Sequence, residues 1–257
     1  MAYNKAMTSK LPRFSDAELK PTRDFLQDVS KILGKVQQVF VPADNHDWQK
    51  GLCLMPQGLA TQPLTPQRLV LDMRAGELQT ENQRWDLTMT TAQQLFAELS
   101  LWTLAQKGGQ APAAPDFSTS EPQFNLKHSQ QLATVLDFVH TTFQAIGSGL
   151  AGGLVSPVLL YPHHFDVSLV WFFARSTAQV AAGFSTGDEM VSEPYFYVTA
   201  SPEPAGFGSQ VLPNGHWQTA GWHGAVLPYA TVVASALSTE VVTQFITDLF
   251  HVAAKPN

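Results

Sequence analysis

The chain has 257 residues, of which 44% are hydrophobic and only 14% charged, a composition typical of a folded globular protein. Its 21 acidic residues outnumber its 15 basic ones, giving a net charge of −6, and Lys and Arg do not cluster along the sequence. Phosphate-rich partners require concentrated Lys and Arg, so we expect neither nucleic acid nor an anionic membrane as a partner. The sequence does not constrain the oligomeric state.

The start of the chain has no apolar segment like that of a signal peptide, and residues 1–20 are predicted to be a loose leader. No apolar run approaches the roughly 18 residues that a membrane helix needs. Cys53 is the only cysteine, which excludes an internal disulfide framework. We therefore expect a soluble, cytoplasmic protein.

In the first half of the chain, apolar residues repeat at helical spacing from Phe25 to Val36, and Thr22 is the expected N-cap of that helix. Short strands are predicted at 52–55, 68–73, 77–80 and 84–89, where apolar and polar residues partly alternate. Thr91 and Gln94 then form a capping-box pattern at the start of a second helix.

Residues 108–127, rich in Gly and Pro, are predicted to be a linker or surface loop. Beyond them a helix should end at Gly147, strands should follow at 158–161, 164–173, 195–199 and within 211–227, and a last helix should begin at Ser238 or Thr239. The halves 21–107 and 128–255 thus share one plan, which suggests internal duplication. We predict a single α+β domain over 21–257, with antiparallel sheets packed against about four amphipathic helices.

Two short motifs match familiar patterns in the wrong context. The glycines of residues 147–152 fit GxGxxG, but they follow a helix and precede a strand, so no nucleotide cofactor is expected. Residues 183–187 fit the GxSxG nucleophile elbow, which needs a strand before the serine and a helix after it. Carboxylates and a proline follow instead of a helix, so we predict a turn there.

Polar and aromatic residues gather between Tyr161 and Tyr229, a segment that contains four of the eight histidines. On a strand that includes residue 164, alternate residues share a face, and Tyr195 and Tyr197 share a face of another strand. The candidate catalytic residues are His164, Asp166 and His223, and the candidate ligand-binding residues are Asp188, Glu189, Tyr195, Tyr197, His216 and Trp222.

An aromatic cleft with a few convergent polar groups is typical of a small-molecule site, and this is the function we favour. The first alternative is an enzyme that uses a metal or a histidine–carboxylate pair for acid–base chemistry. For a metal, His164 and Asp166 are the candidate ligands, with His216 or His223 as a distant third. The second alternative is a purely structural cluster without a pocket. The sequence identifies no cofactor.

The same residues carry a family resemblance. The chain is similar to the bacterial domain-of-unknown-function family 5996 through Leu159–Leu169, Gly183–Asp188, Glu193–Tyr197, Ser201–Pro204, His216-Trp217 and Gly221–Tyr229, and, in the first half, through Gly34–Val36, Asn45–Trp48 and Gly58-Leu59. This resemblance implies one conserved unit and a turn at residues 183–188, but it supplies no reaction and no cofactor. Other members of the family can carry a non-histidine residue at the position of His163, so the resemblance favours His164 and Asp166 over His163.

Overall fold

The computed structural model describes residues 11–13, 15–65, 67–117, 124–174 and 176–254. Within these residues, five α-helices accompany one sheet of 12 strands in which every pair is antiparallel. The predicted α+β class is confirmed, although one continuous sheet replaces the several sheets expected. No helix in this described part combines the length and apolarity needed to cross a membrane.

The sheet consists of two meanders joined at its centre. The first contains β1 (Leu52–Met55), β2 (Gly58–Ala60), β3 (Val70–Asp72), β4 (Glu77–Gln79) and β5 (Arg84–Asp86). The second contains β7 (Leu159–Tyr161), β8 (Asp166–Phe173), β9 (Gln179–Ser185), β10 (Tyr195–Ser201) and β12 (Gly224–Pro228), with β11 (His216–Gln218) at its edge and β6 (Gly153–Val155) paired to β8. The pairs Leu52↔Leu160 and Cys53↔Leu159 connect β1 to β7 and make the sheet continuous.

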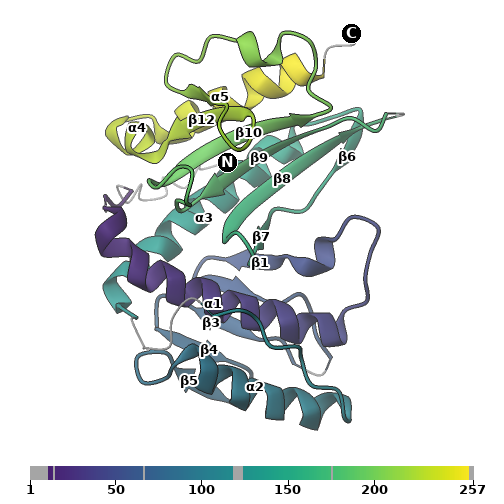
Figure 1. Ribbon diagram of the computed structural model, residues 1–257, viewed down its shortest axis with the longest axis vertical. Helices are drawn as coiled ribbons and strands as arrows, with labels where there is room; N and C mark the ends of the chain where they lie inside the picture. The colour runs from purple at the N-terminus through teal and green to yellow at the C-terminus, as the bar shows by residue number, and fades with distance from the viewer. Residues whose placement is uncertain (1–10, 14, 66, 118–123, 175, 255–257) are drawn as a thin grey trace, which may run out of the picture.

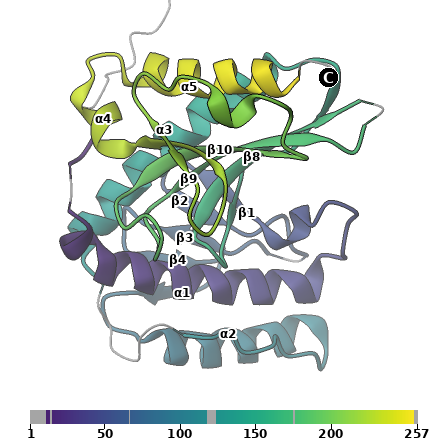
Figure 2. The same ribbon diagram turned by 45° about the horizontal axis from the view of Figure 1, so that its top comes forward.

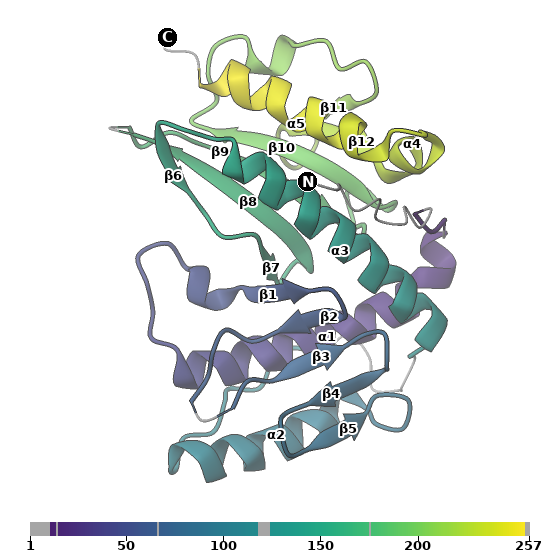
Figure 3. The same cartoon turned by 180° about the vertical axis from the view of Figure 1, so that it is seen from behind.

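The helices cover opposite faces of the two meanders. They are α1 (Asp16–Phe40), α2 (Ala92–Lys107), α3 (Leu126–Ser148), α4 (Tyr229–Ala234) and α5 (Ser238–Ala253), with short 3-10 helices η1 (Trp48–Lys50) and η2 (Phe207–Ser209). In Figure 1, α1 and α2 lie in front of β1–β5, and Figure 3 shows α3 and α5 against the other face of β8–β10. Figure 2 shows α1 running alongside α2. In these views no described α-helix covers the front face of β8–β10 in the way that α3 and α5 cover the other face.

Helix α1 begins at Asp16, so the prediction that it starts after Thr22 is wrong. The helix continues through Pro21, a residue that usually marks a helix start or break. Thr22 is buried, and its hydroxyl accepts a hydrogen bond from the Asn125 N–H (3.1 Å) at the start of α3. Of the predicted leader, residues 16–20 are therefore helical, whereas residues 1–10 and 14 lie outside the described residues.

Strand β9 was not predicted, and its position corrects the turn expected at residues 183–187. Gly183, Phe184 and Ser185 are the last residues of β9, and the turn begins only after them, with Gly187 at φ 102°. Ala181, Ala182 and Gly183 have low strand propensity, which hid this inner strand. Residues 186–194 contain no helix, so Ser185 does not lie in a nucleophile elbow.

Both halves run from a helix through antiparallel strands to a helix, but β6 and α4 of the second half have no counterpart in the first, and internal duplication stays a prediction. α1 and α3 each precede a meander whose first strand lies at the centre of the sheet, and α2 and α5 each follow one. By this topology β1 corresponds to β7. The capping box that starts α2 is confirmed, with Thr91 and Gln94 bonded reciprocally at 2.9 and 3.1 Å.

Candidate functional site

A row of polar residues crosses the open face of the second meander. The register of β7, β8, β9 and β10 places four residues side by side: Tyr161, Asp166, Ser185 and Tyr195. The residues that alternate with them, including Val167 and Phe184, are buried on the face that α3 and α5 cover. In the polar row, Tyr161 and Asp166 are partly exposed, whereas Ser185 and Tyr195 are buried.

Tyr197 and Asp166 are connected across an intervening strand. Tyr197 lies opposite Gly183 on β9, and a Cβ atom on Gly183 would approach Tyr197 Cζ to 2.0 Å. Because glycine has no side chain, the ring lies across β9, and its hydroxyl donates a hydrogen bond to Asp166 Oδ2 on β8.

The two partners of this hydrogen bond have shifted protonation equilibria. Burial raises the pKa of Asp166, while the hydrogen bond from Tyr197 opposes that rise. Burial, followed by the nearby Asp166 charge, raises the pKa of Tyr197 well above its ordinary value, so the phenol remains a donor. The half-buried Asp166 carboxylate is thus fixed in position and has an increased affinity for a proton.

The turn after β9 is fixed from two sides. Tyr195 donates its hydroxyl hydrogen to Asp188 Oδ2 at 2.5 Å, and Asp188 Oδ1 accepts the main-chain N–H groups of Met190 (2.7 Å) and Val191 (2.8 Å). From α1, Arg23 Nη1 donates to the carbonyl oxygen of Thr186 at 3.2 Å. Asp188 is therefore held near the polar row by both β10 and α1.

Trp222 completes an aromatic wall. Its ring stacks on Tyr195 (centroids 6.2 Å apart, 19° between planes) and meets Tyr197 edge to face (6.1 Å, 69°). This wall borders a cavity of about 320 Å³, which we call the aromatic cavity. Its lining residues are His164, Asp166, Ser185, Asp188, Tyr195, Tyr197, Thr199 and Trp222.

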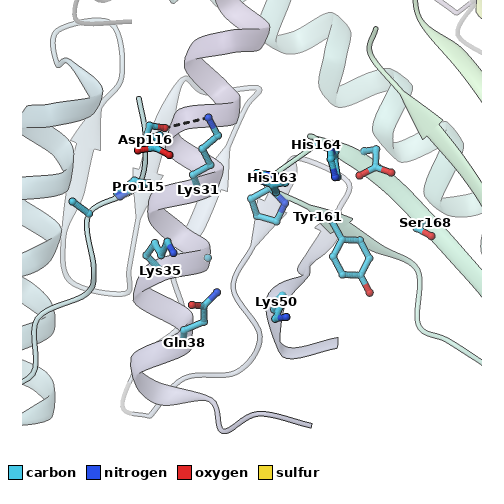
Figure 4. Close-up of a pocket in the computed structure, with 14 residues that line it drawn as sticks. Lys31, Lys35, Gln38, Lys50, Pro115, Asp116, Tyr161, His163, His164 and Ser168 are labelled. Atoms are coloured by element: carbon cyan, nitrogen blue, oxygen red, sulfur yellow. Dashed lines mark hydrogen bonds between the residues drawn. The ribbon is translucent and has the colours of Figure 1, made fainter. Parts of the chain in front are cut away.

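A second cavity, of about 680 Å³, adjoins the first and shares His164 and Asp166 with it. It lies between α1 and the turn that joins β7 to β8 (Figure 4), and we call it the lysine cavity. Helix α1 packs against Pro162 at Gly34, where a Cβ atom would lie 3.4 Å from Pro162 Cγ, at ordinary van der Waals distance. The lining includes Lys31, Lys35, Gln38, Lys50, Asp116, Tyr161 and His163.

The turn between β7 and β8 presents the two neighbouring histidines. His164 was predicted to lie on the strand, but β8 begins at Asp166, and the buried Phe165 has a left-handed φ of 53°. This conformation is costly for a residue with a Cβ, and such strain concentrates at functional sites. Gln27 of α1 donates to the carbonyl oxygen of His163 at 2.8 Å, which ties the turn to α1.

The structure brings together six of the nine predicted site residues: His164, Asp166, Asp188, Tyr195, Tyr197 and Trp222. It separates the other three, His216, His223 and Glu189, none of which lines either cavity. The His223 ring bonds through Nδ1 to the Glu203 carboxylate and stacks on Trp217, 5.6 Å away. His216 lies exposed on the edge strand β11, and Glu189 is exposed in the turn.

A metal centre has little support from this arrangement. Among the residues that the structure describes, no group of three or more His, Cys, Asp or Glu is placed to hold a metal ion. His164 and Asp166 lie together, but His216 and His223, the predicted third ligands, line neither of their cavities. The two-histidine, one-carboxylate arrangement is therefore not formed.

The sequence analysis missed the contribution of α1. Arg23, Gln27, Lys31 and Lys35 recur every four residues and so lie along one stripe, beside the apolar residues that it recognised. This spacing was visible in the sequence. What it could not show was that the stripe faces a turn some 130 residues further along the chain.

Comparisons with known proteins identify a family but no characterised relative. No curated protein matches the chain in sequence, and no solved structure matches it. A family model does match, over residues 11–181 and 173–257, and it describes a family of unknown function, DUF5996. The chain therefore belongs to the DUF5996 family, as its sequence motifs predicted.

Proposed function

We propose that this protein binds a small organic molecule in the groove formed by the aromatic and lysine cavities. An apolar, planar part of the ligand lies against Tyr195, Tyr197 and Trp222, and a polar group contacts Asp166 and His164. The observation that carries the proposal is the Tyr197–Asp166 hydrogen bond across Gly183, because it holds a half-buried carboxylate at the edge of an aromatic-lined cavity.

The dimensions and chemistry of the groove support this reading. Volumes of about 320 and 680 Å³ lie within the range of known ligand sites, roughly 300–1,000 Å³. Tyr and Trp side chains offer large, rigid contact surfaces with few rotatable bonds to immobilise. A purely structural cluster has no need of such an opening beside its rings, so we favour binding over the structural alternative.

Binding can be tested by ligand-observed NMR with a library of one-ring and two-ring compounds that are neutral, anionic or cationic. We expect compounds that bind the wild-type protein and lose binding in Trp222→Ala. The matched control is Trp217→Ala, because Trp217 stacks on His223 and lines neither cavity. Equal binding to wild type and Trp222→Ala, or no binding by any compound, would show that the proposal is wrong.

Acid–base catalysis on the bound molecule is a second candidate, favoured by the raised pKa of Asp166 beside His164. Asp166 is then the group that exchanges a proton with the substrate, and His164 is the residue that assists it. Any compound found by NMR is incubated with the protein, and product is followed by mass spectrometry. Turnover that disappears in Asp166→Asn while binding remains supports catalysis, whereas binding without turnover limits the site to recognition.

A further inference from the structure

We propose that the ligand is an organic anion, whose acidic group lies beside Lys35 in the lysine cavity while its ring occupies the aromatic cavity. This inference rests on the proposed binding function and adds the charge and orientation of the ligand. It follows from the arrangement of cations around the lysine cavity and from the two residues, His164 and Asp166, that both cavities share.

The two cavities adjoin, because His164 and Asp166 line both. In the proposed pose, the ring contacts Trp222 and the acidic group extends past His164 toward α1. Figure 4 shows Lys31, Lys35 and Gln38 along α1 on one side of the lysine cavity, with His163, His164 and Tyr161 on the other. The polar groups at this end come from both walls and can surround one acidic group.

Lys35 differs from the other two lysines of the cavity in its partners. Lys31 pairs with Asp28 (3.2 Å) and donates to the carbonyl oxygen of Asp116 (3.2 Å), and Lys50 pairs with Asp47 (2.9 Å). For Lys35, the described residues provide no hydrogen-bond acceptor or carboxylate at bonding distance. Lys35 is a half-buried residue of the cavity lining, and a lysine that lacks a counter-ion among the described residues favours an anion from solution.

The remaining lining is compatible with an acid of low charge. Tyr161 can donate a hydrogen bond, because burial, with the charges of Asp166, Asp44 and Asp47, raises its pKa to about 12. Two carboxylates, Asp116 and Asp166, also line the cavity, so its three lysines give only a small excess of positive charge. This balance favours a single carboxylate or a comparable monoanion over a polyphosphate.

The experiment uses two probes of nearly identical shape, indole-3-acetate and indole-3-acetamide, which differ in charge. Their binding to the full-length protein is measured by calorimetry. We expect the acetate to bind about tenfold more tightly than the amide, which is the effect of one charge-assisted hydrogen bond. Lys35→Met should remove this difference without changing the affinity for the amide.

Two further variants test whether a change in affinity comes from the charge at Lys35 or from a change in total charge or folding. Lys127→Met removes the same charge from an exposed position that lines neither cavity, and it should change neither affinity. Asp116→Asn removes a carboxylate from the lysine cavity and should strengthen binding of the acetate alone. A general loss of folding cannot produce this increase.

The possible failures are distinguishable. If the amide binds at least as tightly as the acetate, in a manner that depends on Trp222, the anion inference is wrong and the binding function stands. If Lys35→Met leaves a tenfold preference for the acetate unchanged, the placement of the acidic group at Lys35 is wrong. If neither probe binds while compounds of the library do, the anion inference is wrong and the binding function stands.

Discussion

The hydroxyl of Tyr197 on β10 reaches the carboxylate of Asp166 on β8 although β9 lies between the two strands. This contact requires a residue without a side chain on β9, and Gly183 provides it. One glycine thereby determines both the position of an aromatic ring and the environment of a carboxylate. The groove depends on this relationship, and the first two predictions test it.

Tyr197→Phe should destabilise the protein and raise the pKa of Asp166 further. The substitution keeps the ring but removes the donor, and leaving a half-buried carboxylate without it costs about 1–3 kcal/mol at neutral pH. The pKa rises because the hydrogen bond from Tyr197 lowers it in the wild type. Urea denaturation and a carboxyl ¹³C NMR titration measure the two effects.

Tyr195→Phe is the matched control for this substitution. Its acceptor Asp188 is exposed and retains two main-chain N–H donors, so we expect a smaller loss of stability. The pKa of Asp166 in Tyr195→Phe should be closer to the wild-type value than the pKa of Asp166 in Tyr197→Phe. An Asp166 titration that is the same in Tyr197→Phe and wild type would contradict the hydrogen bond.

Gly183→Ala should displace the Tyr197 ring, since the new Cβ would lie 2.0 Å from Cζ. Overpacking of this kind costs about 1–3 kcal/mol of unfolding free energy. If the ring is the cause, the cost should shrink in a Tyr197→Ala background, which a double-mutant cycle measures. Gly149→Ala is the control, because its Cβ would meet only the Ile146 carbonyl oxygen, at 3.5 Å.

The local features of the fold were predictable from the sequence, because they depend on neighbours in the chain. The capping box at Thr91 and Gln94 and the buried face of β8 follow from spacing alone. Strand β9 could not be found in this way, since Gly183 is unfavourable for a strand in isolation. Gly183 leaves room for the ring of Tyr197, which extends from the neighbouring strand β10, and this tertiary contact explains why a glycine lies in β9.

The site was predictable in part for the same reason. Tyr195 and Tyr197 were expected to share a face, and their rings do lie 6.0 Å apart. Trp222 and His223 were assigned to one site, but the chain bends at Trp222 before β12, and Trp222 stacks on Tyr195 while His223 stacks on Trp217. The approach of Lys35 to the turn after β7 depends on tertiary packing at Gly34 and was not available from the sequence.

Asp166→Asn should stabilise the protein at neutral and higher pH. Because burial raises the pKa of Asp166 above 3.8, the folded state binds the proton more tightly than the unfolded chain. The favourable contribution of Asp166 is therefore fully present below pH 3.8 and is lost as pH rises through the folded-state pKa. Asparagine has no charge and can still accept the hydrogen bond from the Tyr197 hydroxyl. The gain in unfolding free energy of Asp166→Asn over the wild type should therefore shrink as the pH falls toward 4.

The opposite behaviour is expected of Asp86→Asn. Hydrogen bonds from the Thr88 hydroxyl and N–H lower the pKa of Asp86, so its contribution is present above pH 3.8 and is lost as pH falls through the lowered value. Urea denaturation of both variants between pH 3 and 8 checks the two signs. A stability difference for Asp166→Asn that does not vary with pH would contradict the raised pKa.

Arg23→Met should loosen the turn that carries Asp188 while leaving the sheet intact. In the wild type, Arg23 Nη1 donates to the carbonyl oxygens of Thr186 (3.2 Å) and Gly187 (3.5 Å), and methionine retains the apolar stem without these bonds. Hydrogen exchange of the Val191 amide, which is bonded to Asp188 Oδ1, should accelerate, whereas amides inside β9 and β10 stay protected. Lys20→Met removes another cation of α1, one that is exposed and paired with Asp24, and it should leave the exchange of Val191 unchanged. Equal exchange rates of Val191 in Arg23→Met and wild type would mean that α1 does not position Asp188, and the groove would then owe its shape to the sheet alone.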